Sequence, residues 1–273
     1  RRPWRSEPCA VTTPTVPRFA ELAAPADWRT VDFISDLHLQ AADAATFDAW
    51  RRYMGATPAD AVFILGDLFE VWVGDDAALP GSFETQCADV MRAGAAQRAV
   101  LFMHGNRDFL VGRQFLDSAG VTLLDDPTVL QFNSSRWLLS HGDALCLDDV
   151  DYLRFRAQVR SADWQQQFLA QPLAARRAVA RQIRDASESR KQSGAPYADV
   201  DATAAREWLQ AAQAPTLIHG HTHHPALHDL GVDTTGQALQ RVVLSDWDLA
   251  ATPPRADLLR LDTQGQLQRV AIT

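Results

Sequence analysis

In the segment Val31-Asp32-Phe33-Ile34-Ser35-Asp36-Leu37-His38, an apolar run of strand length ends in an aspartate and a histidine. Successive side chains of an extended strand point to opposite faces, so Asp36 and His38 leave the strand on the same side. In open α/β sheets, ligands collect at the carboxyl ends of the strands. The stretch therefore predicts an α/β fold with a site where its strands end.

Four further apolar runs end in the same kind of residue, and helical patterns at residues 44–53 and 112–118 lie between some of them. Strand-like runs at 241–245, 258–261 and 267–272 follow. This order predicts a layered α/β domain with a strand-rich end. The four runs and their polar ends are 61–65 before Gly66-Asp67, 99–103 before His104-Gly105-Asn106-Arg107-Asp108, 137–140 before His141-Gly142-Asp143, and 216–218 before His219-Gly220-His221.

The domain organisation follows from length and local composition. A chain of 273 residues, 47% of them hydrophobic, can bury one large core, so we expect one main domain over 29–273. Residues 1–28 are rich in proline and lack the apolar core of a secretory signal, and we interpret them as a loose extension. Residues from about 148 to 212 lack strand signals and have helical apolar spacing, which predicts a helical insertion that caps the site.

Composition excludes several classes of protein. A formal charge of -8 argues against a nucleic-acid binder that works through an overall positive field. No apolar run approaches the roughly 20 residues that span a bilayer. Three cysteines, with neither paired nor framework spacing, indicate a reducing compartment, and we expect the cytoplasm.

The polar residues at the strand ends have the chemistry of a metal centre. Taken singly, each motif has an ordinary explanation, since aspartate, asparagine and histidine often cap turns and helices. Five such motifs in order, each after an apolar run, favour metal ligands. Carboxylate, imidazole and amide ligands suit Mn²⁺, Fe²⁺ or Zn²⁺ better than Ca²⁺ or Mg²⁺. The expected ligands are Asp36, His38, Asp67, Asn106, His141, His219 and His221, and the loop residues without such a role are His223, His224 and His228.

These motifs resemble those of the calcineurin-like metallophosphoesterase superfamily, whose Asp-x-His, Gly-Asp, Gly-Asn-His, His and Gly-His-x-His elements match in order from Asp36 to His221. One departure is that Arg107 follows Asn106 where most of the superfamily has a histidine. With the segments 66–76 and 141–149, it resembles the branch of the UDP-2,3-diacylglucosamine pyrophosphohydrolases of lipid A biosynthesis, over about 30–247. The resemblance implies a two-sheet sandwich flanked by helices, with the helical insertion as a cap.

The resemblance also implies two Mn²⁺ ions. One would be held by Asp36, His38 and His221, the other by Asn106, His141 and His219, with Asp67 between them. The implied reaction is attack of a metal-activated water on the α-phosphorus of UDP-2,3-diacylglucosamine, giving UMP and 2,3-diacylglucosamine 1-phosphate. Implied catalytic residues are Asp67, Asn106, Arg107 and His141, and implied substrate contacts are Asn106, Arg107, Asp149, Ser187, Lys191 and His219.

The expected partners are this acylated UDP-sugar and the cytoplasmic face of the inner membrane, where the lipid lies. Arginines of the insertion would face the diphosphate or an anionic membrane surface. No nucleic-acid or protein partner is inferred. Two alternatives stay open: a metallophosphoesterase for another nucleotide or phosphodiester, and a binding module that kept the fold and lost catalysis. The complete ligand set weighs against the second.

Overall fold

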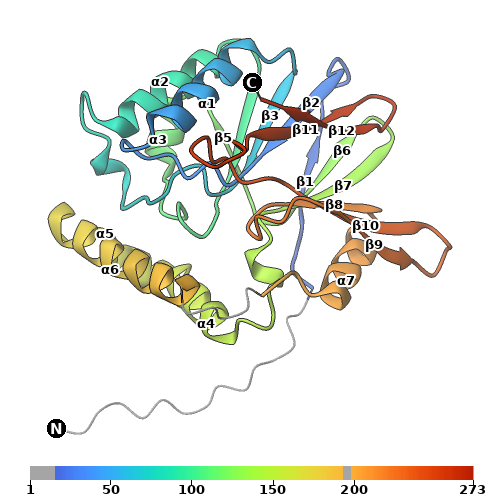
Figure 1. Cartoon of the computed structure of the whole chain (residues 1–273). Coiled ribbons are helices and arrows are strands. Elements are labelled where there is room, and N and C mark those ends of the chain that lie inside the picture. The colour runs from blue at the N-terminus through green and yellow to red at the C-terminus, as the bar shows by residue number, and fades with distance from the viewer. Residues whose placement is uncertain (1–15, 193–197, 273) are drawn as a thin grey trace, which may run out of the picture.

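A computed structural model describes residues 16–192 and 198–272, and the side chains of 184–192 lie outside that description. The chain forms two six-stranded sheets that pack face to face, with helices on their outer faces (Figure 1). The first sheet contains, in spatial order, β12 (Leu267–Ala271), β11 (Asp257–Asp262), β2 (Thr30–Ile34), β3 (Ala61–Leu65), β4 (Ala99–Met103) and β5 (Thr122–Leu124). The second contains β1 (Ala20–Ala23), β6 (Thr128–Phe132), β7 (Ser135–Ser140), β8 (Thr216–His219), β10 (Ala238–Val243) and β9 (Leu227–Val232).

Strand register brings the polar strand ends together. In the first sheet β2, β3, β4 and β5 are parallel, with Ile34 paired to Ile64 and Leu65 to Met103, so their carboxyl ends share one edge. In the second sheet β7 and β8 are also parallel, and Ser140 pairs with His219. The expected α/β sandwich of two sheets flanked by helices is therefore confirmed.

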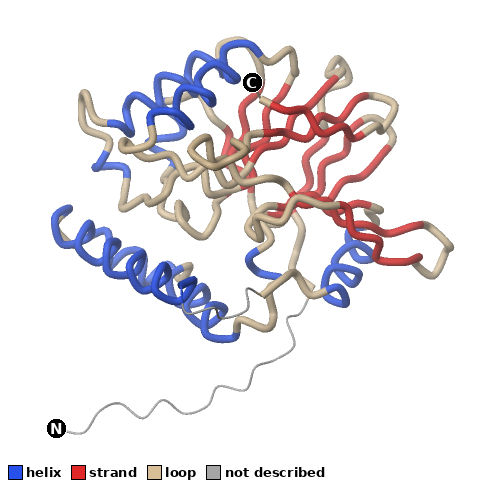
Figure 2. Tube along the Cα trace, in the orientation of Figure 1, coloured by secondary structure: helices blue, strands red, loops and turns tan. Residues whose placement is uncertain are grey.

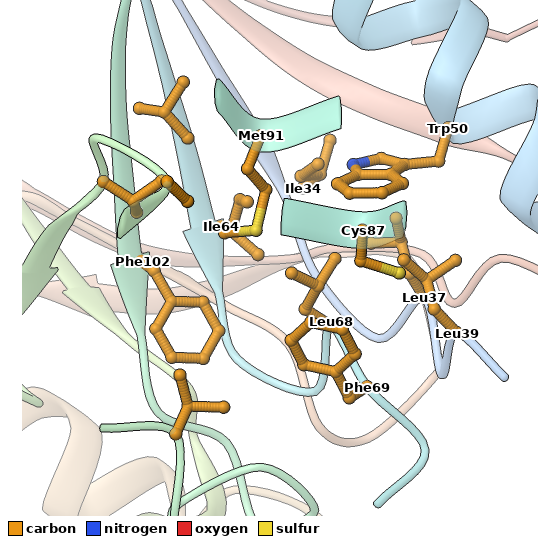
Figure 3. Packing of buried hydrophobic residues seen from close by; sticks show 14 of the residues in the cluster. Ile34, Leu37, Leu39, Trp50, Ile64, Leu68, Phe69, Cys87, Met91 and Phe102 are labelled. Atoms are coloured by element: carbon orange, nitrogen blue, oxygen red, sulfur yellow. The ribbon is translucent and has the colours of Figure 1, made fainter. Parts of the chain in front are cut away.

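The central strands are buried on both faces, which explains their nearly continuous apolar sequences. Phe33 and Phe63 point into the core between the two sheets, whereas Ile34 and Ile64 point to the outer face of the first sheet. Trp50 joins that outer cluster from a helix (Figure 3). Alternation of side chains thus fills two cores from one set of strands.

Helices cover the outer faces of both sheets. Over the first sheet lie α1 (Ala44–Ala56), α2 (Phe83–Ala95) and α3 (Arg113–Ser118), which enclose the outer cluster. Over the second lies α7 (Ala202–Ala212), whose Trp208 and Leu209 pack with Leu217 of β8. Asp43 caps α1 by accepting from the Thr46 amide. Short 3-10 turns, η1 (Asp75–Ala77) and η2 (Asp143–Leu145), follow two of the strand-end motifs.

Three helices of the insertion form a cap beside the sandwich: α4 (Val150–Val159), α5 (Ala162–Leu169) and α6 (Leu173–Gln192). Figures 1 and 2 show them as a layer of their own, apart from the helices on the sheets. The expected insertion to about 212 is too long, because α7 belongs to the core of the second sheet. None of the described helices combines the length and the apolar character that a bilayer span requires.

The expected loose extension over 1–28 is also wrong in part. Residues 20–23 form β1, which pairs in parallel with β6 and so extends the second sheet, with Leu22 opposite Leu130. Phe19 packs edge-on against Trp208 of α7. Residues 1–15 lie outside the described part of the chain.

Candidate metal centre

Backbone hydrogen bonds join the loops that follow the strands. The Asp36 amide donates to Gly66 O at 3.1 Å, and the His38 amide donates to Asp67 O at 3.0 Å. Within the second sheet, the Gly220 amide donates to His141 O at 3.0 Å, and across the two sheets the His221 amide donates to Asp36 Oδ2 at 2.9 Å. These bonds hold the loops in one place before any ligand binds, so the side chains they carry meet at the edge shared by both sheets.

The loops hold several non-glycine residues in the left-handed region, which costs energy and is typical of functional sites. Among the described residues, seven non-glycine residues have a positive φ, and five of them belong to this cluster. These five are Asp36 (φ 56), His38 (φ 49), Asp67 (φ 52), His221 (φ 67) and His223 (φ 54). Because these strained backbone conformations gather in one cluster, we infer that they are kept in order to place the side chains of that cluster.

One group of side chains consists of Asp36, His38 and His223. Nε2 of His223 lies 3.2 Å from Asp36 Oδ1 and 3.2 Å from His38 Nε2, and His38 Nε2 lies 4.0 Å from Asp36 Oδ1. Asp36 is fully buried, and its other oxygen accepts from the amide of His221 at 2.9 Å. The spacing of the three ligand atoms can hold one cation.

A second group surrounds the carbonyl oxygen of Asn106. This Oδ1 atom lies 2.9 Å from His141 Nε2 and 2.8 Å from His221 Nδ1. Asp67 Oδ1 lies 3.7 Å from His141 Nε2. Ligand atoms of Asp36, Asp67 and His141 also lie within 4.8 Å of one another, so the two carboxylates stand between the two groups.

The structure corrects the assignment of the last two ligands. His219 is fully buried, and its ring contacts Gly220 O at 2.9 Å and an Arg241 nitrogen at 3.3 Å, so it faces away from the cluster. His223, which we expected to be a loop residue without such a role, takes the place beside Asp36 and His38. His221 joins Asn106 and His141 rather than the Asp36 group.

The charges of the cluster favour a cation. Burial lowers the pKa of His141, but the carboxylates of Asp67, Asp36 and Asp143 outweigh it and raise the pKa to about 9. Burial raises the pKa of Asp36, but the charges of His223, His141 and His38 outweigh it and lower the pKa. The negative charge of the buried carboxylates thus keeps the His141 imidazole protonated in the metal-free protein. A bound metal ion could supply this positive charge in place of the proton.

The donor set fits divalent first-row metals. Imidazole nitrogens, two carboxylates and one amide oxygen are the mixture that such ions accept. The described cysteines, Cys87 and Cys146, are buried in the hydrophobic clusters. The backbone of two glycines lies close to the two carboxylates. A Cβ on Gly220 would lie 2.3 Å from Asp36 Oδ2, and one on Gly105 would lie 2.1 Å from Asp67 Oδ1. These glycines leave room for the carboxylates, so the residues present fit a metal centre.

Charged residues around the cluster fix its members. Glu70 Oε2 lies 3.2 Å from His38 Nδ1, and Glu70 Oε1 lies 3.7 Å from an Arg107 nitrogen. Buried Asp108 accepts from the amides of Leu68 and Gly105, both at 2.8 Å. The Arg107 amide donates to Asp67 Oδ1 at 2.8 Å. The Gly66-Asp67 loop and the Gly105-Asn106 loop are therefore held as one unit. Neither Glu70 nor Asp108 was expected from the sequence to have this role.

A hollow lies between this unit and the cap. Asn106 and Arg107 form part of its wall, and most of the rest is apolar. In the cap, the rings of Trp164 and Phe168 stack with centroids 4.7 Å apart. The lining residues are Glu70, Val71, Trp72, Val73, Asn106, Arg107, Phe109, Leu110, Phe155, Trp164, Phe168, Ala180 and Ile183.

Four of the expected substrate contacts are placed outside this hollow or cannot be placed. Asp149 caps α4, accepting from the Tyr152 amide at 3.1 Å, and its substrate role stays a prediction. Ser187 and Lys191 fall in the stretch of α6 whose side chains lie outside the described residues. The expected contact of His219 with substrate has no support in its buried position.

Comparison with known proteins agrees with this geometry. Residues 29–225 match the calcineurin-like phosphoesterase family. Proteins named UDP-2,3-diacylglucosamine hydrolase are similar: one from Chromobacterium violaceum is 47% identical, covering 80% of this chain and 90% of that protein. One from Chromohalobacter salexigens is 41% identical, with 80% and 89% covered, and one from Stenotrophomonas maltophilia is 40% identical, with 86% and 96% covered. The chain therefore belongs to the calcineurin-like phosphoesterases, in the family of the UDP-2,3-diacylglucosamine hydrolases.

Proposed function

We propose that this protein hydrolyses the pyrophosphate of UDP-2,3-diacylglucosamine, giving UMP and 2,3-diacylglucosamine 1-phosphate in lipid A biosynthesis. The observation that carries the proposal is that Asn106 and Arg107 belong both to the metal-centre loops and to the wall of an apolar hollow. A substrate that joins a diphosphate to acyl chains has the same two parts. The names of the similar proteins support this assignment.

We further propose two Mn²⁺ ions per chain. Asp36, His38 and His223 would hold one, and Asn106, His141 and His221 the other, with Asp67 between them. When bound, such ions would lower the pKa of a bound water molecule and would offset the negative charge of the phosphoryl oxygens. No nucleophile from the protein is then required.

The residues of the chain orient the diphosphate for in-line attack of water on the α-phosphorus. Asn106 and Arg107 lie where they can stabilise charge on the non-bridging oxygens. The bond between the α-phosphorus and the bridging oxygen breaks, and the sugar phosphate leaves as a stable anion. Such a leaving group needs no protonation, which explains an arginine at position 107 in place of an acid histidine. Arg107→His would lower the rate with the natural diphosphate.

The cap would receive the acyl chains. Trp164, Phe168 and Phe155 give the hollow an apolar wall, which lowers the free energy of a buried alkyl chain by roughly 0.8 kcal/mol per methylene. Val71 and Ile183, at the same hollow, are 46% and 41% exposed. These exposed apolar side chains support docking at the cytoplasmic face of the inner membrane, where we place the protein.

A substrate panel in labelled water tests the function. Protein loaded with Mn²⁺ is given UDP-2,3-diacylglucosamine in detergent micelles, UDP-N-acetylglucosamine, and bis-p-nitrophenyl phosphate, each in H₂¹⁸O. We expect a strong preference for the acylated substrate, and ¹⁸O in UMP, because attack on the α-phosphorus places the new oxygen there. Label in the sugar phosphate, or equal turnover of the unacylated nucleotide sugar, would contradict the proposal.

A further inference from the structure

Helix α4 of the cap makes charged contacts with the loop that carries His141. Asp143 in that loop is fully buried, and its Oδ2 accepts from Arg156 Nε at 2.8 Å and from the hydroxyl of Tyr152. An Arg160 nitrogen lies 3.9 Å from the same oxygen. Tyr152 and Arg156 of α4 and its C-cap residue Arg160 thus converge on one carboxylate, because the spacing of four residues places them on one side of the helix.

Arg160 also reaches the loop that carries Asn106 and Arg107. Its NH2 group donates to Gly105 O at 2.8 Å, and its guanidinium carbon lies 5.6 Å from the ring centre of Phe109. On the other side of the same residue, the Gly105 amide donates to Asp108 Oδ1 at 2.8 Å. Gly105, the residue before Asn106, is therefore held through its amide by Asp108 of the sandwich and through its carbonyl by Arg160 beside the cap.

We propose that Arg160 is a positioning residue for the phosphoryl-binding loop, coupling the cap to the placement of Asn106 and Arg107. Its planar guanidinium can pair with Asp143, donate to Gly105 O and stack on Phe109 at once, which a single point charge cannot do. The coupling means that a ligand that fills the hollow beneath the cap acts on the same loop that binds the diphosphate. The identity of the substrate in this inference rests on the proposed function, whereas the contacts of Arg160 do not depend on it.

A second arginine anchors the cap without touching that loop. Buried Arg176, in α6, donates to both oxygens of Asp76, to Val73 O and to Gln171 O. The loss of Arg176 should loosen the cap alone, whereas the loss of Arg160 should also release the Gly105 peptide. A comparison of variants at Arg160 and Arg176 therefore distinguishes anchoring of the cap from positioning of the Gly105-Asn106 loop.

The test compares the same substitution at three arginines: Arg160→Gln, Arg176→Gln and Arg154→Gln. Arg154 is on α4 with a side chain 60% exposed and pairs with Asp151, so it is the matched control. For Arg160→Gln we expect kcat to fall roughly 10–100-fold with both the acylated substrate and bis-p-nitrophenyl phosphate, the range typical for lost partners of metal-site residues. Arg176→Gln should raise KM for the acylated substrate only, and Arg154→Gln should match wild type.

Hydrogen exchange in the metal-free proteins gives a readout independent of turnover. The amides of residues 105–109 should exchange faster in Arg160→Gln than in wild type, but not in Arg176→Gln or Arg154→Gln. Arg160→Lys, which keeps one donor for Gly105 O, should recover part of kcat. If Arg160→Gln does not fold, Arg160→Met, which keeps the apolar stem against Phe109, replaces it in the same comparison.

Two outcomes overturn the inference: wild-type kcat on bis-p-nitrophenyl phosphate in the Arg160 variant, or unchanged exchange of residues 105–109. Failure of the proposed function is distinct, since wild type would then cleave the diester and not the acylated nucleotide sugar. In that case the exchange data and the diester kinetics still decide the role of Arg160.

Discussion

Nε2 of His223 lies 3.2 Å from Oδ1 of Asp36, although the two residues are 187 positions apart. This contact makes the third histidine of the run His219-Gly220-His221-Thr222-His223, rather than the expected second one, the partner of the Asp36 carboxylate. The consequence is that His221 and His223 face one metal group each, and His219 faces neither.

Replacement of His223 should therefore lower metal content, whereas replacement of His219 should leave it unchanged. His223→Ala should weaken binding of one metal by roughly 100-fold or more, because loss of surrounding hydrogen bonds alone typically costs 10–100-fold. His219→Asn should retain both metals, since its ring contacts Gly220 O and Arg241. Metal analysis after dialysis, together with turnover, checks both. Full metal loading of His223→Ala would show that His223 is no ligand.

The histidine register shows where prediction from sequence stops. Asp36 and His38 do lie together, as expected, but both follow the end of β2 at Ile34 and have positive φ, so strand alternation is not the cause. The strand period likewise no longer applies beyond His219, where β8 ends. His221 and His223 have positive φ, which turns each side chain to a direction that the sequence pattern does not determine. The superfamily motif Gly-His-x-His, aligned on Gly220, was the signal that could have found His223.

Some elements of the fold can be predicted from their own sequence, whereas others depend on contacts with distant parts of the chain. Buried strands such as β3 and β4 were predicted with the correct bounds, because an apolar run of strand length is a local signal. Strand β1 was missed because its half-exposed sequence becomes a strand only by pairing with β6, more than a hundred positions away. Helix α2 was also missed, although Phe83, Cys87 and Met91 have the spacing of one helix face.

Glu70 should contribute to metal binding through His38. Its Oε2 atom lies 3.2 Å from His38 Nδ1, the ring nitrogen that faces away from Asp36 and His223. Because a carboxylate there orients the ring and raises its basicity, Glu70→Gln should weaken metal binding 10–100-fold. Competition with a chelator measures this, and Glu207→Gln, on the exposed side of α7, is the matched control. Equal affinity in the Glu70 and Glu207 variants would contradict the role.

His141 should make the stability of the metal-free protein depend on pH. Its pKa is raised from 6.5 to about 9 in the folded protein, so its stabilisation is fully present below pH 6.5 and is lost as pH rises through about 9. The shift corresponds to a loss of about 3 kcal/mol. The measurement is the free energy of unfolding of wild type minus that of His141→Asn across this range. A difference that does not change with pH would exclude a charged His141.

The apolar wall of the cap should act on substrate affinity and leave the chemistry alone. Trp164 stacks on Phe168 and contacts Phe109, and all three line the hollow beside Arg107. Removing one such ring costs roughly 1.5–3 kcal/mol of buried apolar contact, or about 10- to 100-fold in affinity. Trp164→Ala should therefore raise KM for UDP-2,3-diacylglucosamine by that factor.

The same variant should keep its kcat with bis-p-nitrophenyl phosphate, because this diester has no acyl chain for the cap to bind. Leu169→Ala is the control, because Leu169 lies on the same helix with 41% of its surface exposed. Equal KM values for the acylated substrate in Trp164→Ala and wild type would mean that the acyl chains bind elsewhere. Loss of kcat on the diester would instead mean that the cap aromatics hold the catalytic loop, since Phe109 follows Asn106 and Arg107 closely in the chain and contacts Trp164.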